Sequence, residues 1–481
     1  MPVLFAILLP LGLGLLAAAL LFRRDGEASP GLLDRLAIAW PLGAGLVTFQ
    51  LFLLALVRIP FSLGVMVPLL LAETAALGFF ARKLGALVLP RPSFGLAADL
   101  ASPAIAGWKK AAMAVLATWA LAKLGSVALE AWLRPIFAWD SWANWSASAK
   151  VFYHAKGLLL DAPPADFFGG NAVSRIQSYP LHNHLLQVWF ALWSGGFDEV
   201  LVKLWSPMNF LTLAGLLYGF SLREAGRTTA LAILVIFISS PLMSYHATEA
   251  YSDLMLGALL CFALLSFLRA MRGGAGSWPL IGFFSALALF TKNEAPGFVF
   301  PLLLSAAFWL WTNRSQVPLA GTLARMLAPL LFAVPWFLFK FTYALSLTQD
   351  AHRMQPVWHP GVLEFVVKAI LSFQNYGIVL AALPVLLLLN GRPSRELLHV
   401  LFPVAFFVSF FILLYYLIEY YYSTLFMGTI FFRNMMTWYP SAVAVLVLVL
   451  GSLLQKTVLP AAVPAAAPGR PAKKKRERSG P

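Results

Sequence analysis

Apolar residues are grouped along the chain in runs of roughly 20, most of them separated by short polar segments. A run of about 20 apolar residues is long enough to cross a bilayer as a helix. The runs do not alternate apolar and polar residues, as the strands of a membrane barrel do, so they predict helices. We expect about thirteen transmembrane helices, near 3–22, 34–57, 61–81, 110–130, 200–221, 228–245, 252–271, 278–292, 296–312, 324–346, 372–390, 397–418 and 433–454.

Composition agrees with an all-α integral membrane protein. The 481 residues are 60% hydrophobic and only 11% charged, whereas soluble domains carry about 25% charged residues. The run at 3–22 has no basic leader and is followed by Arg23 and Arg24, so it predicts a retained helix and not a signal peptide. The one cysteine, Cys261, lies inside a span, which excludes a disulfide framework.

The positions of the basic residues predict the orientation of the chain. The net charge of +15 does not indicate nucleic-acid binding, because most basic residues fall in short loops and in the tail 473–478. Lys and Arg in short loops mark the cytoplasmic side. If 131–199 contains no full crossing, all the clusters fall on that side: Arg23, Arg24 and Arg35; Arg82, Lys83, Arg91, Lys109 and Lys110; Arg223 and Arg227; Arg269 and Arg272; Arg314 and Arg325; Arg392 and Arg395; and the tail. We therefore expect 131–199 to be one long external segment.

The chain divides into four predicted parts. These are an N-terminal extension of three membrane helices and a cytoplasmic connector, a membrane core, a C-terminal group of membrane helices, and a basic cytoplasmic tail, at 1–107, 108–345, 346–455 and 456–481. A later external loop is expected at 347–371. In the first external segment, 131–199, the apolar stretch 185–193 is too short to span and predicts a re-entrant or surface-lying helix. The tail is expected either to contact anionic headgroups or to be a disordered solubilising segment.

Asp140 is the first candidate for chemistry. It lies in the aromatic sequence Trp139-Asp140-Ser141-Trp142-Ala143-Asn144-Trp145, directly after a span. Tryptophan prefers the lipid–water boundary, and a carboxylate there is costly unless water, a partner or chemistry accounts for it. As a general base it could take a proton from an acceptor hydroxyl. The structural alternative is a helix N-cap.

His246, Glu249 and Asp253 form the second candidate. Spacings of three and four put them on one face of a helix, if that helix already includes His246. Two carboxylates and an imidazole suit a divalent ion such as Mg²⁺ or Mn²⁺. The alternative is that the acids complement the dipole at the helix N-terminus.

Several cationic groups share the external face with these acids. Lys292 ends an apolar run, where it could meet a phosphate or form an interfacial pair with Glu294. The others are Arg175, His182, His184, Arg353 and Arg433. Each alone fits an interface anchor, but together they predict an anion site framed by aromatic residues.

The order of these motifs resembles the polytopic GT-C glycosyltransferases, in particular the bacterial aminoarabinose transferases and protein O-mannosyltransferases. In that family an essential Asp begins a long first external loop, as Asp140 does here. The family's Tyr-Pro-Pro-Leu stretch is similar to Tyr179-Pro180-Leu181-His182, with one proline replaced. Its acidic second loop resembles Asp253-Leu254-Met255-Leu256, and its Leu-Thr-Lys-Gly resembles Phe290-Thr291-Lys292-Asn293. The resemblance covers roughly 108–345.

The resemblance implies an inverting transferase of a bacterial inner membrane that takes a sugar from a polyprenyl-phosphate-linked donor to an envelope acceptor. Asp140 would be the general base, on the periplasmic or extracellular face. Glu249 and Asp253 would bind a metal or orient the donor, with metal dependence left open. Lys292, with Arg353 or Arg433, would stabilise the departing lipid phosphate.

Two other functions share these features. A transporter or flippase of lipid-linked sugars could use the same cations, but it is expected to place charges near mid-membrane in broken helices. A polymerase or ligase of envelope polysaccharide is expected to have one dominant late external loop, whereas the dominant loop here comes early. Both patterns favour the transferase.

Overall fold

The computed structural model describes residues 2–23, 25, 30–87, 95–160, 179–345, 354–426 and 429–458, and these are mostly helical. Arg175, Arg353 and the basic tail lie outside them. The helices are α1 (Val3–Phe22), α2 (Leu32–Leu56), α3 (Leu63–Lys83), α4 (Gly95–Ala101), α5 (Gly107–Leu133), α6 (Ala147–Ala155), α7 (His182–Ser194), α8 (Trp205–Ile238), α9 (Pro241–Ala247), α10 (Ser252–Met271), α11 (Trp278–Leu289), α12 (Pro296–Thr312), α13 (Leu319–Leu327), α14 (Val334–Thr342), α15 (Val362–Leu371), α16 (Val379–Asn390), α17 (Arg395–Leu417), α18 (Glu419–Phe426) and α19 (Thr429–Val458). A π-helical turn, η2, spans Ser141–Ser146, and 3-10 turns span Leu201–Lys203, Ala275–Ser277 and Ala328–Ala333. The one β-bridge among the described residues joins Pro356 to Ile418.

The predicted all-α membrane architecture is confirmed. Eight helices of the described chain are long and apolar enough to cross a membrane, with α13 and α14 together counted as one, Leu319–Thr342. The other five of the thirteen predicted runs fall on shorter or broken helices, namely the two arms of α8 with α9, and α11, α12 and α16.

Gly226 breaks α8 into two arms. Its φ of +78° and ψ of 171° lie in a region that is nearly restricted to glycine. After the break the chain returns to where it started: Lys203 Nζ donates to the Thr248 carbonyl at 2.7 Å, and Ser206 Oγ donates to the His246 carbonyl at 2.8 Å. The arms therefore run antiparallel, which agrees with the two separate runs predicted for this region.

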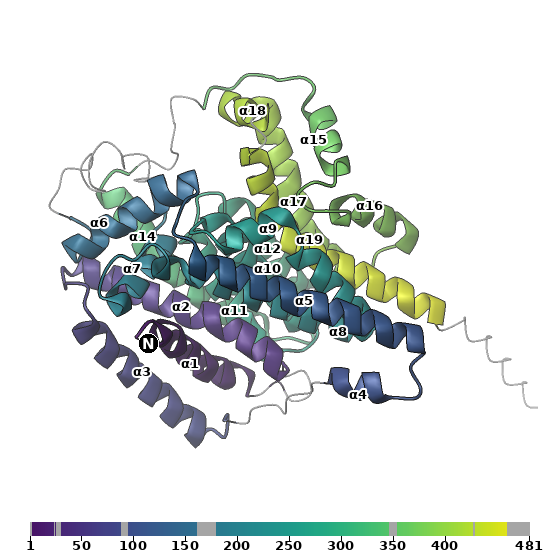
Figure 1. Ribbon diagram of the computed structural model, residues 1–481, viewed down its shortest axis with the longest axis horizontal. Helices are drawn as coiled ribbons and strands as arrows, with labels where there is room; N and C mark the ends of the chain where they lie inside the picture. The colour runs from purple at the N-terminus through teal and green to yellow at the C-terminus, as the bar shows by residue number, and fades with distance from the viewer. Residues whose placement is uncertain are drawn as a thin grey trace, which may run out of the picture.

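Helix α10 is the centre of the molecule. Along the apolar stretch of α10 that could span a membrane, 94% of the residues are buried. Helices α8, α11 and α19 pack around it. Figure 1 shows α10 surrounded by these helices, with α3 on the outside at the opposite edge from α18. Only 11% of the residues in the corresponding apolar stretch of α3 are buried. Because α10 is apolar along its length but carries Asp253 in its first turn and Arg269 in its last, it links two polar ends.

The N-terminal extension is joined to the core through α7. This short helix, predicted to be re-entrant or surface-lying, is buried against α1 and α2. Trp189 Nε1 donates to the Ala6 carbonyl at 2.9 Å, and His182 Nδ1 lies 2.7 Å from Thr48 Oγ1. Helix α6, by contrast, buries Phe152 and leaves its last residues exposed, as a surface-lying helix does.

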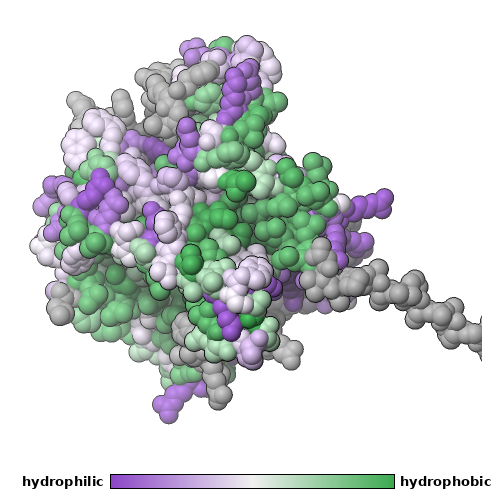
Figure 2. Space-filling view, turned by 45° about the vertical axis from the view of Figure 1, so that its right-hand side comes forward, coloured by the Kyte–Doolittle hydropathy of each residue, from purple (hydrophilic) through white to green (hydrophobic). Residues whose placement is uncertain are grey.

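Residues from several predicted cytoplasmic clusters meet at one end of the bundle. Arg223 and Arg269 both donate to Asp34, and Arg272 donates to Glu224 and Glu396. In Figure 2, hydrophobic residues cover much of the face in view, and hydrophilic residues gather toward its margins. Arg223, Arg269 and Arg272, which belong to two of the predicted clusters, thus lie at the same end of the bundle.

Candidate functional site

A cavity of about 660 Å³ lies at the opposite end of α10 from these arginines. Its wall is built from segments that are far apart in sequence: the start of the first external loop, the first turn of α10, the 292–294 segment after α11, the end of α17, α18 and the start of α19. In Figure 1, α17 and α18 rise at the top of the view above this end of the bundle. The cavity is therefore bounded by the predicted external ends of the helices.

Asp140 faces this cavity. It immediately precedes the π-helical turn η2, a local geometry that is rare and often found at functional sites. Its carboxylate makes no capping hydrogen bond to the turn, so the N-cap interpretation is wrong. Instead Asp140 Oδ1 accepts from Asn144 Nδ2 at 3.1 Å, and Oδ2 accepts from the Arg433 guanidinium.

Asp253 is held between two cations. Its Oδ1 accepts from Lys292 Nζ at 2.9 Å, and its Oδ2 accepts from Arg433 Nη2 at 3.1 Å and Nε at 3.3 Å. His246 Nδ1 lies 3.9 Å from the same Oδ2. Asp253 is 1% exposed, so these partners supply the compensation that a buried carboxylate requires. Its place in the first turn of α10 also complements the helix dipole.

Arg433 connects the two acids. It lies near the start of α19 and bonds Asp140 with one nitrogen and Asp253 with the other two. Its guanidinium carbon lies 4.7 Å from the ring centroid of Tyr251, a cation–π distance. One arginine therefore couples residues that are 293 positions and 180 positions away in the chain.

Lys292 is buried with its partners. It is 3% exposed, which rules out the predicted alternative of a lysine that reaches to the interface. Nζ lies 3.2 Å from Glu294 Oε1, in addition to its bond to Asp253. Burial alone lowers the pKa of the ammonium group, but the charges of Asp253 and Glu294 outweigh it and raise the pKa above its ordinary value. Lys292 is thus a fixed positive charge.

The side chains across the cavity differ in character. Phe410, Phe411 and Leu414 of α17 form an apolar section, whereas Tyr420 and Tyr421 of α18 add aromatic rings with hydroxyl groups. Three carboxylates (Asp140, Asp253, Glu294) face two cations (Lys292, Arg433), which leaves a net charge of −1 in the lining.

Glu249 does not join Asp253. It lies 4.0 Å from Lys203 Nζ, and both side chains are fully buried outside the cavity lining. Burial raises the pKa of the Glu249 carboxyl, against a smaller lowering by Lys203. The predicted common face fails because α9 ends at Ala247 and α10 begins only at Ser252, so no continuous helix joins His246 to Asp253.

The described residues do not fit the predicted divalent-metal site. They contain no group of three or more His, Cys, Asp or Glu side chains that could hold a metal ion. His246 and Asp253 are neighbours, but Asp253 already bonds two cationic side chains.

The two predicted phosphate-binding histidines lie behind the cavity wall. His182 bonds Thr48 of α2, and the ring of His184 packs 5.2 Å from that of Trp145, which does line the cavity. Burial lowers the pKa of both imidazoles to about 3, so neither supplies positive charge at neutral pH. Their arrangement fits support of the wall and not phosphate binding.

Three polar residues of the site were not singled out from the sequence. Asn144 follows Asp140 by one turn, a spacing that predicts contact when the segment is helical. Asn293 lines the cavity, and Lys340 Nζ donates to its Oδ1 at 3.3 Å. Lys340 is 3% exposed within an apolar run, and an isolated lysine in such a run is the signal that could have identified it.

Comparison with known proteins gives one structural similarity to report. No protein-family model and no curated protein sequence matches the chain. Among solved structures, a crystal structure of ArnT from Cupriavidus metallidurans bound to undecaprenyl phosphate is similar, with a TM-score of 0.48 and 13% identity. The match covers 71% of this chain and 60% of that chain.

Proposed function

We propose that the protein is a membrane glycosyltransferase that moves a sugar from a polyprenyl-phosphate-linked donor to an envelope acceptor. The observation that carries the proposal is the cavity in which Asp140 meets Lys292 and Arg433 beside an apolar wall. Such a cavity offers a base for an acceptor hydroxyl, positive charge for a phosphate and a surface for a lipid.

Lys292 and Arg433 are the proposed phosphate ligands. The bond that breaks joins the sugar to a phosphate oxygen, so negative charge increases on that oxygen in the transition state. Cations that are already in place stabilise this charge most effectively, because they need no reorganisation during the reaction. Asp253 fixes both of them, through three hydrogen bonds that use both of its oxygens.

Arg433 also controls whether Asp140 is available. As the structure stands, the guanidinium occupies Asp140 Oδ2. A donor phosphate competes for the same guanidinium and leaves the carboxylate free to accept a proton. In the proposed step Asp140 takes the acceptor hydroxyl proton, the acceptor oxygen bonds to the sugar carbon from the side opposite the phosphate, and the lipid phosphate departs. The sugar is thereby transferred with inversion.

The two sections of the wall fit the two parts of such a donor. The apolar side chains of α17 suit the isoprenoid portion, since removing apolar surface from water is favourable by about 25 cal/mol per Å². The Tyr420 and Tyr421 rings with their hydroxyl groups suit a sugar, which presents both C–H faces and hydrogen-bonding groups. The charged groups lie at helix ends and not at mid-span, which supports a transferase over a transporter.

The experiment is to delete the gene, restore variants and compare envelope glycolipids by mass spectrometry. Wild type should restore a sugar-modified species, and Asp140→Asn should reduce it by about 10²–10⁴, the usual contribution of a general base. Glu130→Gln is the matched control, because Glu130 makes only a half-exposed pair with Arg134 and such pairs contribute little.

The same experiment separates the alternatives. Full product with Asp140→Asn, at equal protein level in the membrane, would show that Asp140 is not the base. A transporter would change where the lipid-linked sugar is found while the sugar stays on its carrier, so a new position of intact donor with no sugar transfer would contradict the proposed reaction.

A further inference from the structure

A second polar cavity, of about 310 Å³, lies at the other end of the bundle between α2, α8 and α10. Arg269 lines it, 16 residues after Asp253 on the same helix. At 1.5 Å per residue the two positions are about 24 Å apart along the helix axis. The second cavity is therefore separate from the proposed catalytic site and belongs to the opposite membrane face.

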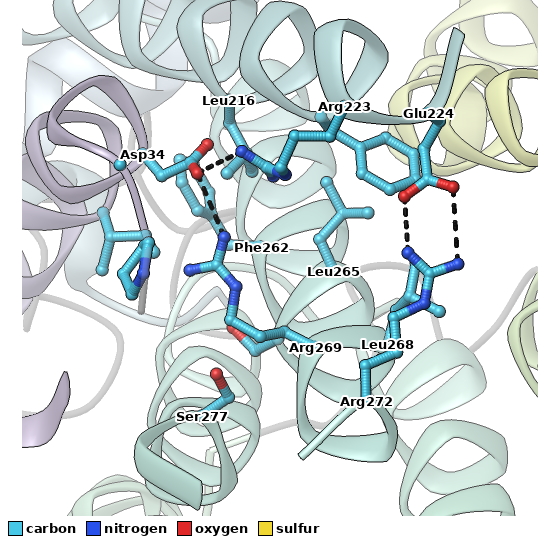
Figure 3. Close-up of a pocket in the computed structure, with 15 residues that line it drawn as sticks. Asp34, Leu216, Arg223, Glu224, Phe262, Leu265, Leu268, Arg269, Arg272 and Ser277 are labelled. Carbon is cyan, nitrogen blue, oxygen red and sulfur yellow. Dashed lines mark hydrogen bonds and ion pairs between the residues drawn. The ribbon is translucent and has the colours of Figure 1, made fainter. Parts of the chain in front are cut away.

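Two arginines in this cavity have most of their hydrogen-bonding capacity unused. Arg223 and Arg269 each donate to Asp34 Oδ2, the latter at 3.1 Å, and neither makes another hydrogen bond to an acid among the described residues. A guanidinium carries five N–H donors. Figure 3 shows both groups pointing at the Asp34 carboxylate, Arg223 from the right of the view and Arg269 from below. Together the three side chains carry a net charge of +1.

Arg272, in the same cavity, is different. Its Nε donates to Glu396 at 3.0 Å, and its two terminal nitrogens donate to the two oxygens of Glu224. Figure 3 shows this parallel pairing of Arg272 with Glu224 on the right of the view. Arg272 is therefore fully paired, whereas Arg223 and Arg269 are the two arginines of this lining with donors left for a ligand.

Two buried polar atoms in the lining lack partners among the described residues. They are Asp34 Oδ1, an acceptor, and the Ser277 hydroxyl, which both donates and accepts. Asp34 is 1% exposed and Ser277 is fully buried. Leaving a buried polar atom without a hydrogen-bond partner destabilises the protein. A ligand that donates to Asp34 and accepts from Ser277 removes both costs.

We propose that this cavity binds the headgroup of a zwitterionic phospholipid with a primary ammonium group, that is, phosphatidylethanolamine. The phosphate lies between Arg223 and Arg269 and accepts from Ser277, and the ammonium group donates to Asp34 Oδ1, the carboxylate oxygen that these two arginines leave unpaired. Apolar side chains of α8 and α10, including Leu216, Phe262 and Leu265, line the rest of the cavity for the start of the acyl chains. Polar pockets between membrane helices are known positions for lipid headgroups.

The lipid would connect the N-terminal extension to the core. Asp34 belongs to α2 of the extension, whereas Arg223 and Arg269 belong to core helices α8 and α10. A headgroup whose phosphate binds the two arginines and whose ammonium group binds Asp34 therefore bridges the two parts at one membrane face. This gives the extension a function that does not depend on the transfer reaction.

The test measures lipid-dependent thermal stability of the purified full-length protein in detergent. Phosphatidylethanolamine is titrated beside phosphatidylcholine, which has the same phosphate and net charge but no N–H donor, and beside soluble phosphoethanolamine. We expect phosphatidylethanolamine to raise the melting temperature with an apparent Kd at least tenfold lower than that of either comparator. Equal shifts with phosphatidylcholine would overturn the ammonium contact, and equal shifts with soluble phosphoethanolamine would overturn the lipid.

The matched variants are Arg223→Gln and Arg272→Gln, which remove one charge each from the same cavity. Arg223 is 46% exposed at its side chain, and the buried Asp34 keeps its pair with Arg269 when Arg223 is replaced. Arg223→Gln should weaken the lipid effect at least tenfold, and Arg272→Gln should keep it within about threefold, because Arg272 is already fully paired. Equal loss in both variants would mean a general charge effect and no specific site.

Discussion

Arg433 is the residue on which the proposed mechanism depends most. Its planar guanidinium reaches Asp140 and Asp253 at once, which a lysine ammonium group, as a single point charge, does not reproduce. We predict that Arg433→Lys reduces the sugar-modified product by about 10²-fold or more, the usual loss when one preorganised donor to a transition state is removed. Mass spectrometry of envelope glycolipids, normalised to membrane protein level, measures it.

Arg134→Lys is the control for that substitution. Arg134 is half-exposed at the same end of the molecule and pairs with Glu130 on the surface of α5. Its replacement should leave the product within about twofold of wild type, since exposed pairs contribute at most about 1 kcal/mol. A normal product level with Arg433→Lys would remove Arg433 from the reaction and leave Lys292 as the only phosphate ligand.

The sequence identified the main site residues but not how they are paired. Asp140, Asp253, Lys292 and Arg433 were all predicted on one face, and the structure brings them around one cavity. Sidedness follows from charge and hydropathy, which are properties of the sequence. Pairing depends on where helices start, and the break between α9 and α10 removed Glu249 from the predicted group.

At the scale of helices, the apolar runs predicted where a helix exists better than they predicted the residues at which it begins and ends. The run 372–390 predicted a full span, but α16 begins only at Val379. Phe373 and Gly377 before it have positive φ values of 55° and 56°, so the chain turns there in spite of its apolar composition. A run of apolar residues indicates only that a segment is kept away from water. Where the chain turns depends on contacts between side chains and backbone, which hydropathy does not describe.

The crossing of α1 and α2 gives a prediction at this scale. A Cβ atom at Gly14 would lie 1.8 Å from the Ala39 carbonyl oxygen, whereas one at Gly12 of the same helix meets nothing within 4 Å. We predict that Gly14→Val lowers the melting temperature of the purified protein, with a cost of about 1–3 kcal/mol or more from overpacking. Gly12→Val should leave it nearly unchanged. Similar melting temperatures for the two variants would contradict the close packing of the extension.

At the scale of the whole molecule, the two cavities lie at opposite ends of one buried helix. The end with Arg223, Arg269 and Arg272 collects clusters that the positive-inside rule assigns to the cytoplasm. The other end collects Asp140 and its partners. The proposed lipid site and the proposed catalytic site therefore face different leaflets, and the orientation of the whole chain decides which compartment supplies the acceptor.

That orientation is tested by cysteine labelling in intact cells. Cys261 is fully buried, so it does not react, and single cysteines can be placed at Ala155 and Arg392, which are both exposed and lie at opposite ends. We predict that a membrane-impermeant maleimide labels Ala155→Cys in cells whose cytoplasmic membrane is intact, and labels Arg392→Cys only after that membrane is permeabilised. The reverse pattern would place Asp140 in the cytoplasm, where the acceptor could not be an external envelope molecule, and the proposed function would have to be abandoned.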